Sequence, residues 1–422
     1  MITNQKVEFN TVPQYSSYRW MVLASVLLAF TTQYVVYLSW NPFIPVSKDL
    51  FGFTMTQAGS LVTATLIGRI ILQIPGGIVA DTYNPKWILV ISLLFLGLSA
   101  VLMGLSSQYI FFFISRFFVG IFSVAVFPCC VKYLMAWFPK EQRATAMGIL
   151  IMATSAGVTI TNAVVPYFIK NHGWSSAFYV IGTASVMIAV FLAFMLKSQP
   201  SNALDGSIEN SKTKKTFNFN AFISDVKILV KDKNLMLAMF VFGTSFWATW
   251  GATAWAMAYL SKGVGIPLVT AGAMMSVFGI AALVSEPIIG FVSDKLGGAR
   301  KAVISIVSVA FALLLFSFPF VRDEQLLWIY VVLLGVAAFG YKGPLNTLIP
   351  ELTEKRLAGT ATALSLFISL LLSTVQPIII GKILDLVSSA ISYKVAFGVL
   401  GAGALISFVL NALIVEKKGQ GY

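Results

Sequence analysis

The sequence has few residues of the kinds that build metal and redox sites. It contains two cysteines and one histidine among 422 residues. Cys129 and Cys130 are neighbours in an apolar run, where adjacent cysteines rarely form a disulfide because the linkage is strained. The single histidine, His172, stands in a short loop, so a cluster of histidine and thiolate ligands is excluded. We therefore expect no cofactor and no metal.

Charged residues are also scarce. They make up 11% of the chain, whereas 58% of the residues are hydrophobic and the mean hydropathy is +0.86. A soluble domain carries about 25% charged residues, so an ordinary water-soluble globule is excluded. The net charge is +13, but the basic residues lie at the ends of apolar runs, which argues against nucleic-acid binding. No nucleotide-binding loop of the Walker type is visible, so we do not expect transport driven by ATP hydrolysis. No nucleophile–base set is visible either, so we do not expect an enzyme.

Long apolar runs separated by short polar loops fill most of the chain. A helix crosses a bilayer with about 20 such residues and satisfies its own backbone hydrogen bonds, whereas β-barrel strands would be shorter and alternate in polarity. We therefore expect an all-α membrane protein with twelve spanning helices. No cleavable signal peptide is visible, so the first span would serve as the insertion signal. The expected spans are 20–44, 56–80, 87–106, 110–137, 144–168, 175–196, 235–259, 269–293, 301–320, 326–349, 358–380 and 395–414.

Short polar motifs recur along the chain at one constant offset of 213 residues (294 minus 81). The pairs at this offset are Gly77 and Gly290, Asp81 and Asp294, and Arg143 and Arg356. One offset shared by two unrelated loops indicates two similar halves, and thus two pseudo-symmetric six-helix bundles. We divide the chain into a tail (1–19), a first bundle (20–197), a linker (198–234), a second bundle (235–414) and a tail (415–422).

The distribution of basic residues predicts the orientation of the chain. If both termini are cytoplasmic, six of the 29 Lys and Arg residues lie on the opposite side and three lie within spans, which leaves twenty on the cytoplasmic side. The six are Lys48, Lys170, Lys262, Arg322, Lys382 and Lys394. We therefore expect cytoplasmic termini in a multi-pass protein of the cell (inner) membrane. The second part of the linker places Phe222, Val226, Leu229 and Val230 at helical spacing, which predicts an amphipathic helix on the inner membrane surface.

Several local motifs together resemble those of the major facilitator superfamily, over nearly the whole chain. They are Gly77-x-x-x-Asp81, Gly290-x-x-x-Asp294-Lys295-x-Gly297, Arg116-x-x-x-Gly120, Trp137-Phe-Pro139 through Arg143 to Gly148, Gln73-Ile-Pro75-Gly76-Gly77 and Gly173-Trp174 through Phe178. The last three resemble the organic-anion branches of that family. The chain departs from the family at Thr82, where a basic residue is favoured, and at Asn84, where glycine is favoured. The segment 157–166 lacks the glycine-rich pattern of drug–proton antiporters, which weakens the interpretation as a drug exporter.

The resemblance implies a transporter whose two bundles rock around a central cavity. Carboxylates at helix ends can cap a helix or pair with basic residues across a loop. We expect Asp81 and Asp294 to pair with basic residues such as Arg143 and Arg356 and to latch the cytoplasmic ends together, or else to form static pairs. The expected gating residues are Gly77, Asp81, Arg143, Gly290, Asp294, Arg300 and Arg356.

Four charged residues lie deep inside the expected spans, away from the span ends. Arg69, Arg116 and Lys342 are basic, and Glu286 is the one deep carboxylate. A charge at this depth costs about 3 kcal/mol, so each should face protein or a water-filled cavity. The positive excess favours an anionic substrate. Lys342 and Arg116 are candidates for substrate contact, Glu286, Arg116 and Arg69 for proton coupling, and a structural pairing remains the alternative for each.

Polar and aromatic residues gather on the spans that line the cavity in the resembled fold. Tyr34, Tyr37 and Asn41 keep to one helical face. Trp247 and Trp250 are too deep for interfacial anchors, and Tyr341 adjoins Lys342 in a stretch rich in helix breakers, Gly340 to Pro344. We expect substrate binding by Lys342, Arg116, Tyr34, Tyr37, Asn41, Trp247, Trp250 and Tyr341.

These observations predict a secondary active transporter that moves a small, carboxylate-type organic anion by alternating access, with protons as the coupling ion. Two alternatives stay open: an exporter of amphiphilic or cationic compounds, and a membrane receptor or scaffold that does not transport. The expected partners are the anion, protons and membrane lipids, without nucleic acid, and we expect a monomer.

Overall fold

The structure is a computed structural model that describes residues 17–197, 219–296, 299–354, 356–388 and 391–415. Both predicted tails, apart from their innermost residues, and the first part of the linker lie outside the described residues. The described part contains helices and loops but no strand. Twelve helical segments are long and apolar enough to cross a membrane, which confirms the predicted fold class.

Each half supplies six of these segments. The first half contains α1 (Tyr18–Leu38), η1 (Asn41–Val46), α2 (Ser47–Phe51), α3 (Met55–Thr82), α4 (Pro85–Gly104), α5 (Tyr109–Ser123), α6 (Val126–Trp137), α7 (Lys140–Ile151), α8 (Ala153–His172) and α9 (Trp174–Met195). The second half contains α11 (Lys233–Ala258), η3 (Tyr259–Val264), α12 (Leu268–Lys295), α13 (Arg300–Ser317), η4 (Phe318–Phe320), α14 (Glu324–Gly340), α15 (Lys342–Glu351), α16 (Ala358–Leu386) and α17 (Ser392–Ala412). The linker helix α10 (Phe219–Lys231) lies between them in sequence.

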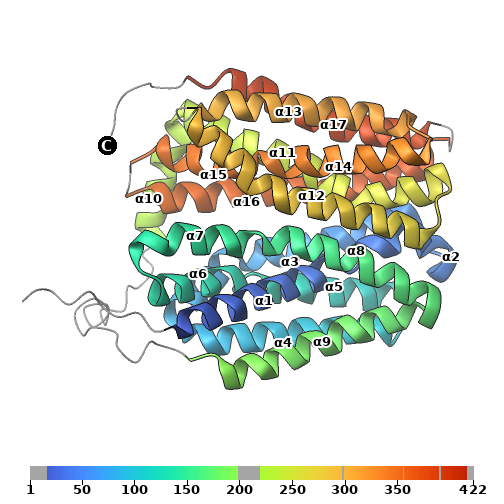
Figure 1. Cartoon of the computed structure of the whole chain (residues 1–422), viewed down its shortest axis with the longest axis horizontal. Helices are drawn as coiled ribbons and strands as arrows, with labels where there is room; N and C mark the ends of the chain where they lie inside the picture. Colours follow the sequence, from blue (N-terminus) through green and yellow to red (C-terminus); the bar gives the residue numbers. More distant parts are fainter. Residues whose placement is uncertain (1–16, 198–218, 297–298, 355, 389–390, 416–422) are drawn as a thin grey trace, which may run out of the picture.

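The two halves lie side by side, the first below and the second above in Figure 1. Their helices run roughly along the long axis of the molecule, with α2 at one end and α10 at the other. We call these the α2 end and the α10 end. The first residues of α1 and the last of α17 both lie at the α10 end, where Tyr18 donates a hydrogen bond to Met195 and Asn234 to Val415. The described ends of the chain are therefore on one side.

Local sequence explains where many helices begin. Thr54 and Gln57 form a reciprocal capping box at the start of α3. Asp232 and Asp323 each accept a hydrogen bond from the backbone N–H three residues on, at the starts of α11 and α14. The caps at Thr54 and Asp323 lie in short loops predicted between spans, and Asp232 lies in the predicted linker.

Two of the spans are interrupted four residues before a proline, although Pro75, Pro166, Pro287 and Pro377 lie inside continuous helices. The ring of a proline clashes with the carbonyl four residues earlier, which for Pro128 belongs to Val124 and for Pro344 belongs to Gly340. Accordingly α5 and α6 are separated at Val124, and α14 ends at Gly340. The break before Lys342 agrees with the prediction of a broken helix there. The break at Val124 divides a segment that the sequence predicts as one helix, 110–137.

The linker helix packs on the second half. Leu229 of α10 is 1% exposed and shares a hydrophobic cluster with Leu235 of α11, whereas Val230 is half-exposed. Arg356 donates a hydrogen bond to Asp225 of α10 at 2.7 Å. The described part of the linker is thus helical over Phe219–Lys231, whereas its position on the inner membrane surface stays a prediction.

Candidate functional site

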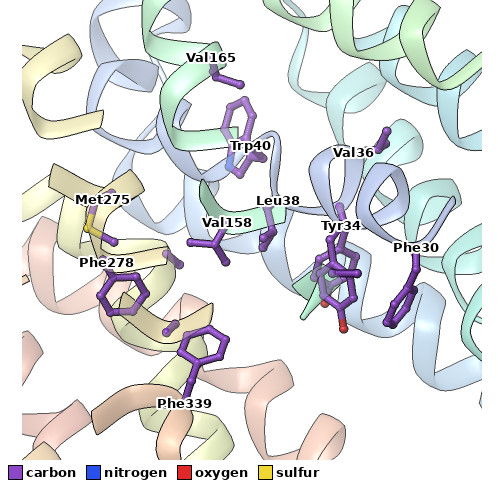
Figure 2. Close-up of a cluster of buried hydrophobic side chains, with 14 of the residues drawn as sticks. Phe30, Tyr34, Val36, Leu38, Trp40, Val158, Val165, Met275, Phe278 and Phe339 are labelled. Atoms are coloured by element: carbon purple, nitrogen blue, oxygen red, sulfur yellow. The ribbon is translucent and has the colours of Figure 1, made fainter. Parts of the chain in front are cut away.

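A cavity lies between the two halves, toward the α2 end. Its lining from the first half includes Tyr37 and Asn41, and from the second half Trp250, Ser373 and Gln376. Apolar side chains from both halves surround this region (Figure 2), with Tyr34 of α1 on one side and Phe278 of α12 and Phe339 of α14 on the other. Arg116 lines the same cavity. The sequence predicts binding by Tyr37, Asn41, Arg116 and Trp250, but it does not single out the two polar residues of α16.

Arg69 of α3 is a cation without an acidic partner among the described residues. It interacts with the hydroxyl groups of Tyr34 and Tyr37, and its guanidinium carbon lies 5.6 Å from the centre of the Tyr37 ring. Its Nε atom is buried and has no hydrogen-bond partner. Tyr34 is fixed in turn by α8, where a Cβ on Gly157 would come within 2.4 Å of the Tyr34 Cβ. Only a residue without a side chain lets α8 approach α1 this closely.

Arg116 of α5 holds the end of α1. Its guanidinium donates hydrogen bonds to the carbonyls of Val36 at 3.4 Å and Tyr37 at 2.7 Å, and the residue is 1% exposed. These carbonyls belong to the last turn of α1, where few backbone N–H groups remain as donors. The Val36 carbonyl also accepts hydrogen bonds from the N–H and the hydroxyl of Ser39. One turn on, Gly120 lies against α3, where an added Cβ would be 2.1 Å from the carbonyl oxygen of Thr65. The Arg-x-x-x-Gly motif thus fixes α5 against two neighbouring helices.

Lys342 and Glu286 form a buried ion pair in the second half. The Lys342 Nζ lies 3.3 Å from the Glu286 Oε1, and the two side chains are 12% and 7% exposed. The hydroxyl of Ser155, on α8 of the first half, also donates to this oxygen at 3.4 Å. The other carboxylate oxygen, Oε2, is buried without a partner. The pair therefore contacts both halves and is incompletely satisfied.

Aromatic rings connect the two cationic positions. The ring of Trp250 stacks on that of Tyr34, with centroids 6.2 Å apart and planes at 8°, and lies 6.3 Å from the rings of Tyr37 and Phe339. We call these four residues the aromatic belt. The Lys342 Nζ lies 3.9 Å from the Phe339 ring centre and 5.8 Å from that of Trp250. The belt thus runs from Arg69 in the first half to Lys342 in the second.

Two other predicted binding residues lie at the edge of this arrangement. Trp247 packs on α17, where a Cβ on Gly403 would be 2.7 Å from its ring. Tyr341 is 1% exposed, and its ring lies 6.0 Å from that of Phe242. Tyr34, Tyr37 and Trp250 lie close to Arg69 and Lys342. Trp247 and Tyr341 are less closely associated with this group.

The predicted gating residues contact their own half. Arg300 pairs with Asp294 at 3.2 Å and with Glu351 at 2.7 Å, and Arg356 pairs with the linker helix. Arg143 donates to backbone carbonyls of Met135 and Phe138. The side chain of Asp81 lies outside the described residues, and a Cβ on Gly77 or Gly290 would meet nothing within 4 Å. The latch between the halves stays a prediction.

The described polar contacts that join the halves lie at the α2 end and along α8, α12 and α16. Asp385 of α16 accepts hydrogen bonds from the backbone N–H groups of Met55 and Thr56, at 2.9 and 2.8 Å, and from the Thr56 hydroxyl at 2.6 Å. Lys262 pairs with Asp49 at 2.5 Å. Close backbone approach adds to this junction, because a Cβ on Gly59 would lie 2.2 Å from the Pro377 carbonyl oxygen. Nothing in the local sequence marks Asp385.

Comparisons with known proteins agree with this architecture. The sequence model described as Major Facilitator Superfamily matches residues 21–377. The chain is 25% identical to a probable sulfoacetate transporter of Cupriavidus necator, over 95% of this chain and 97% of the relative. It is 26% identical to a cis,cis-muconate transport protein of Acinetobacter baylyi, over 88% of each chain.

A solved structure shares the fold. A bacterial homologue of the human lysosomal transporter Spinster, described as inward-facing and unoccupied, superposes with a TM-score of 0.71 at 15% identity, over 94% of this chain and 96% of that one. The relatives are transporters rather than enzymes, as the sequence predicts. With its twelve membrane-spanning helices and a family match over most of its length, this multi-pass membrane protein belongs to the major facilitator superfamily.

Proposed function

We propose that this protein transports a small organic anion across the cell membrane by alternating access, coupled to protons. The observation that carries the proposal is Arg69, a cation beside Tyr34 and Tyr37 of the aromatic belt, with no acidic partner among the described residues. A charge at bilayer depth costs about 3 kcal/mol, and an anionic ligand would offset that cost by pairing with it. The sulfoacetate and muconate transporters among the relatives also support an organic anion.

Alternating access is supported by where the halves touch. Six described residue pairs form polar contacts across the halves, and all involve the α2 end or the middle of α8, α12 and α16. The ion pairs described at the α10 end stay within the second half and α10. With cytoplasmic termini, the α2 end is the outer side, so we infer a state that is closed to the outside and faces inward.

Proton coupling is assigned to Glu286. Its carboxylate pairs with Lys342 and accepts a hydrogen bond from Ser155 of the other half. A proton on Glu286 would remove the charge that holds Lys342 and weaken a contact between the halves. The same pairing speaks against a cationic substrate, because the carboxylate that such a compound needs already has a basic partner.

Uptake into proteoliposomes tests the proposal. Labelled monocarboxylates, dicarboxylates and sugar acids are offered with and without an inward proton gradient. Arg69→Gln should abolish uptake, whereas Arg322→Gln, which changes an arginine bonded to Gly263 within its own half, should leave it intact. Glu286→Gln should make the rate independent of pH.

Two results would remove the proposal. One is uptake by Arg69→Gln at the wild-type rate. The other is binding of an anion without its movement across the membrane, which would favour the receptor alternative. A rate of the Glu286→Gln variant that still follows the proton gradient would remove the coupling assignment alone.

A further inference from the structure

We propose that the transported anion carries two acidic groups, and that Lys342 forms a second anion site which Glu286 occupies while the pocket is empty. The inference rests on the proposed function, because it concerns the chemistry of the same substrate. It goes further in naming two sites, one on each half, and an internal carboxylate as the competitor for one of them.

The first argument is the symmetry of the two cations about the aromatic belt. Arg69 lies 5.6 Å from the ring of Tyr37 on the first half, and Lys342 lies 5.8 Å from the ring of Trp250 on the second. The rings of Tyr37 and Trp250 are 6.3 Å apart. A short organic chain lying along these rings would reach a cation at each end.

The second argument is that Glu286 is a poor partner for Lys342. A charge-assisted N–H···O bond is about 2.7–2.9 Å long, whereas Lys342 lies 3.3 Å and Ser155 3.4 Å from the Glu286 Oε1. The Oε2 atom has no partner, although the residue is 8% exposed. Buried ion pairs are stable when their remaining hydrogen-bonding positions are filled. An incoming carboxylate or sulfonate with better geometry can therefore replace this one.

The third argument is a surplus of buried donors around the belt. Atoms there without a partner include the Nε1 of Trp250, the Nε2 of Gln376, and the Nε atoms of Arg69 and Arg116. Buried donors in native proteins are nearly always paired, so these require a ligand or water that supplies acceptors. A dianion supplies at least four acceptor oxygens and no charged donor.

A matched series of acids tests the inference. Binding of α,ω-dicarboxylates from succinate to suberate is compared, by isothermal titration at pH 7.5, with monocarboxylates of the same carbon number. At least one dicarboxylate should bind ten times more tightly than its monocarboxylate partner, or better. The double variant Lys342→Gln/Glu286→Gln removes the pair as a unit, so no unpaired charge is left buried. It should lower the affinity for that dicarboxylate to the level of the monocarboxylate.

Glu286→Gln alone provides a second measurement. It removes the competing carboxylate and leaves Lys342 charged, so the favoured dicarboxylate should bind several times more tightly than to the wild type. Equal affinities for both series, or an equal loss for both in the double variant, would overturn the inference while leaving anion transport in place. Failure of every acid to bind and to be taken up would instead remove the proposed function, and the second anion site with it.

Discussion

Replacing Asp385 by asparagine should loosen the junction between the halves at the α2 end. The carboxylate accepts three hydrogen bonds, of 2.6 to 2.9 Å, from Met55 and Thr56 at the start of α3. It thereby places a negative charge at the N-terminus of a helix that belongs to the other half.

The free energy lost at the junction follows from the interactions that asparagine retains. Its amide keeps one acceptor oxygen, so the variant loses one hydrogen bond, worth about 0.5–1.5 kcal/mol, and the charge at the helix terminus, worth about 0.3–1 kcal/mol. Asp385 is exposed, which keeps the total near 1–2 kcal/mol. At about 1.4 kcal/mol per tenfold, the ratio of open to closed states at the α2 end should rise roughly 5- to 30-fold.

Distances between spin labels measure this ratio. Lys48 and Lys382 are exposed residues of different halves near the α2 end, and each is replaced by a labelled cysteine. The two native cysteines, both buried, are first replaced by alanine. In Asp385→Asn the long-distance population should grow at the expense of the short one.

Asp323→Asn is the matched control. Asp323 also accepts a hydrogen bond from a helix N-terminus, at 2.9 Å from the Leu326 nitrogen, but the helix belongs to its own half. It should therefore cost stability without changing the distance distribution. Identical distributions for Asp385→Asn and Asp323→Asn would refute the assignment of Asp385 to the junction.

Two further predictions concern the support of the pocket. Gly157→Ala should push Tyr34 away and cost about 1–3 kcal/mol by overpacking, seen as a lower melting temperature and weaker anion binding. Gly148→Ala, where a Cβ meets nothing within 4 Å, should be neutral in both measurements. Arg116→Gln should lower thermal stability by about 1–3 kcal/mol, since it removes the 2.7 Å hydrogen bond to the buried Tyr37 carbonyl, and anion affinity should fall less than in Arg69→Gln. A large affinity loss at unchanged stability would instead place Arg116 in direct contact with the anion.

The spans could be predicted because a membrane constrains each segment separately. Length and apolarity decide whether 20 residues can cross, and neither depends on the rest of the chain. The helix break before Lys342 could also be predicted, because the ring of Pro344 clashes with a carbonyl four residues earlier. The break at Val124 follows from Pro128 in the same way, although the apolar pattern runs through it.

The site could be predicted only in part. Tyr34, Tyr37 and Trp250 stand out as aromatic residues too deep for an interfacial anchor, and the structure places them together. Ser155 and Asp385 could not be found, because their partners lie 131 and about 330 residues away. Such contacts depend on how the halves meet, for which one sequence contains no local signal.

The energy of the contact at the α2 end also supports the proposed substrate with two acidic groups. A ligand shifts a conformational equilibrium only by its difference in affinity for the two states. To open the α2 end, the bound anion must offset the contact made by Asp385, which three hydrogen bonds at an exposed site place at about 1–3 kcal/mol. One charge-assisted contact is worth about 1.5–3 kcal/mol, which leaves little surplus after ordering the ligand. A dianion that draws Arg69 and Lys342 together from opposite halves gains a second such contact, and it gains it only where the halves close around it.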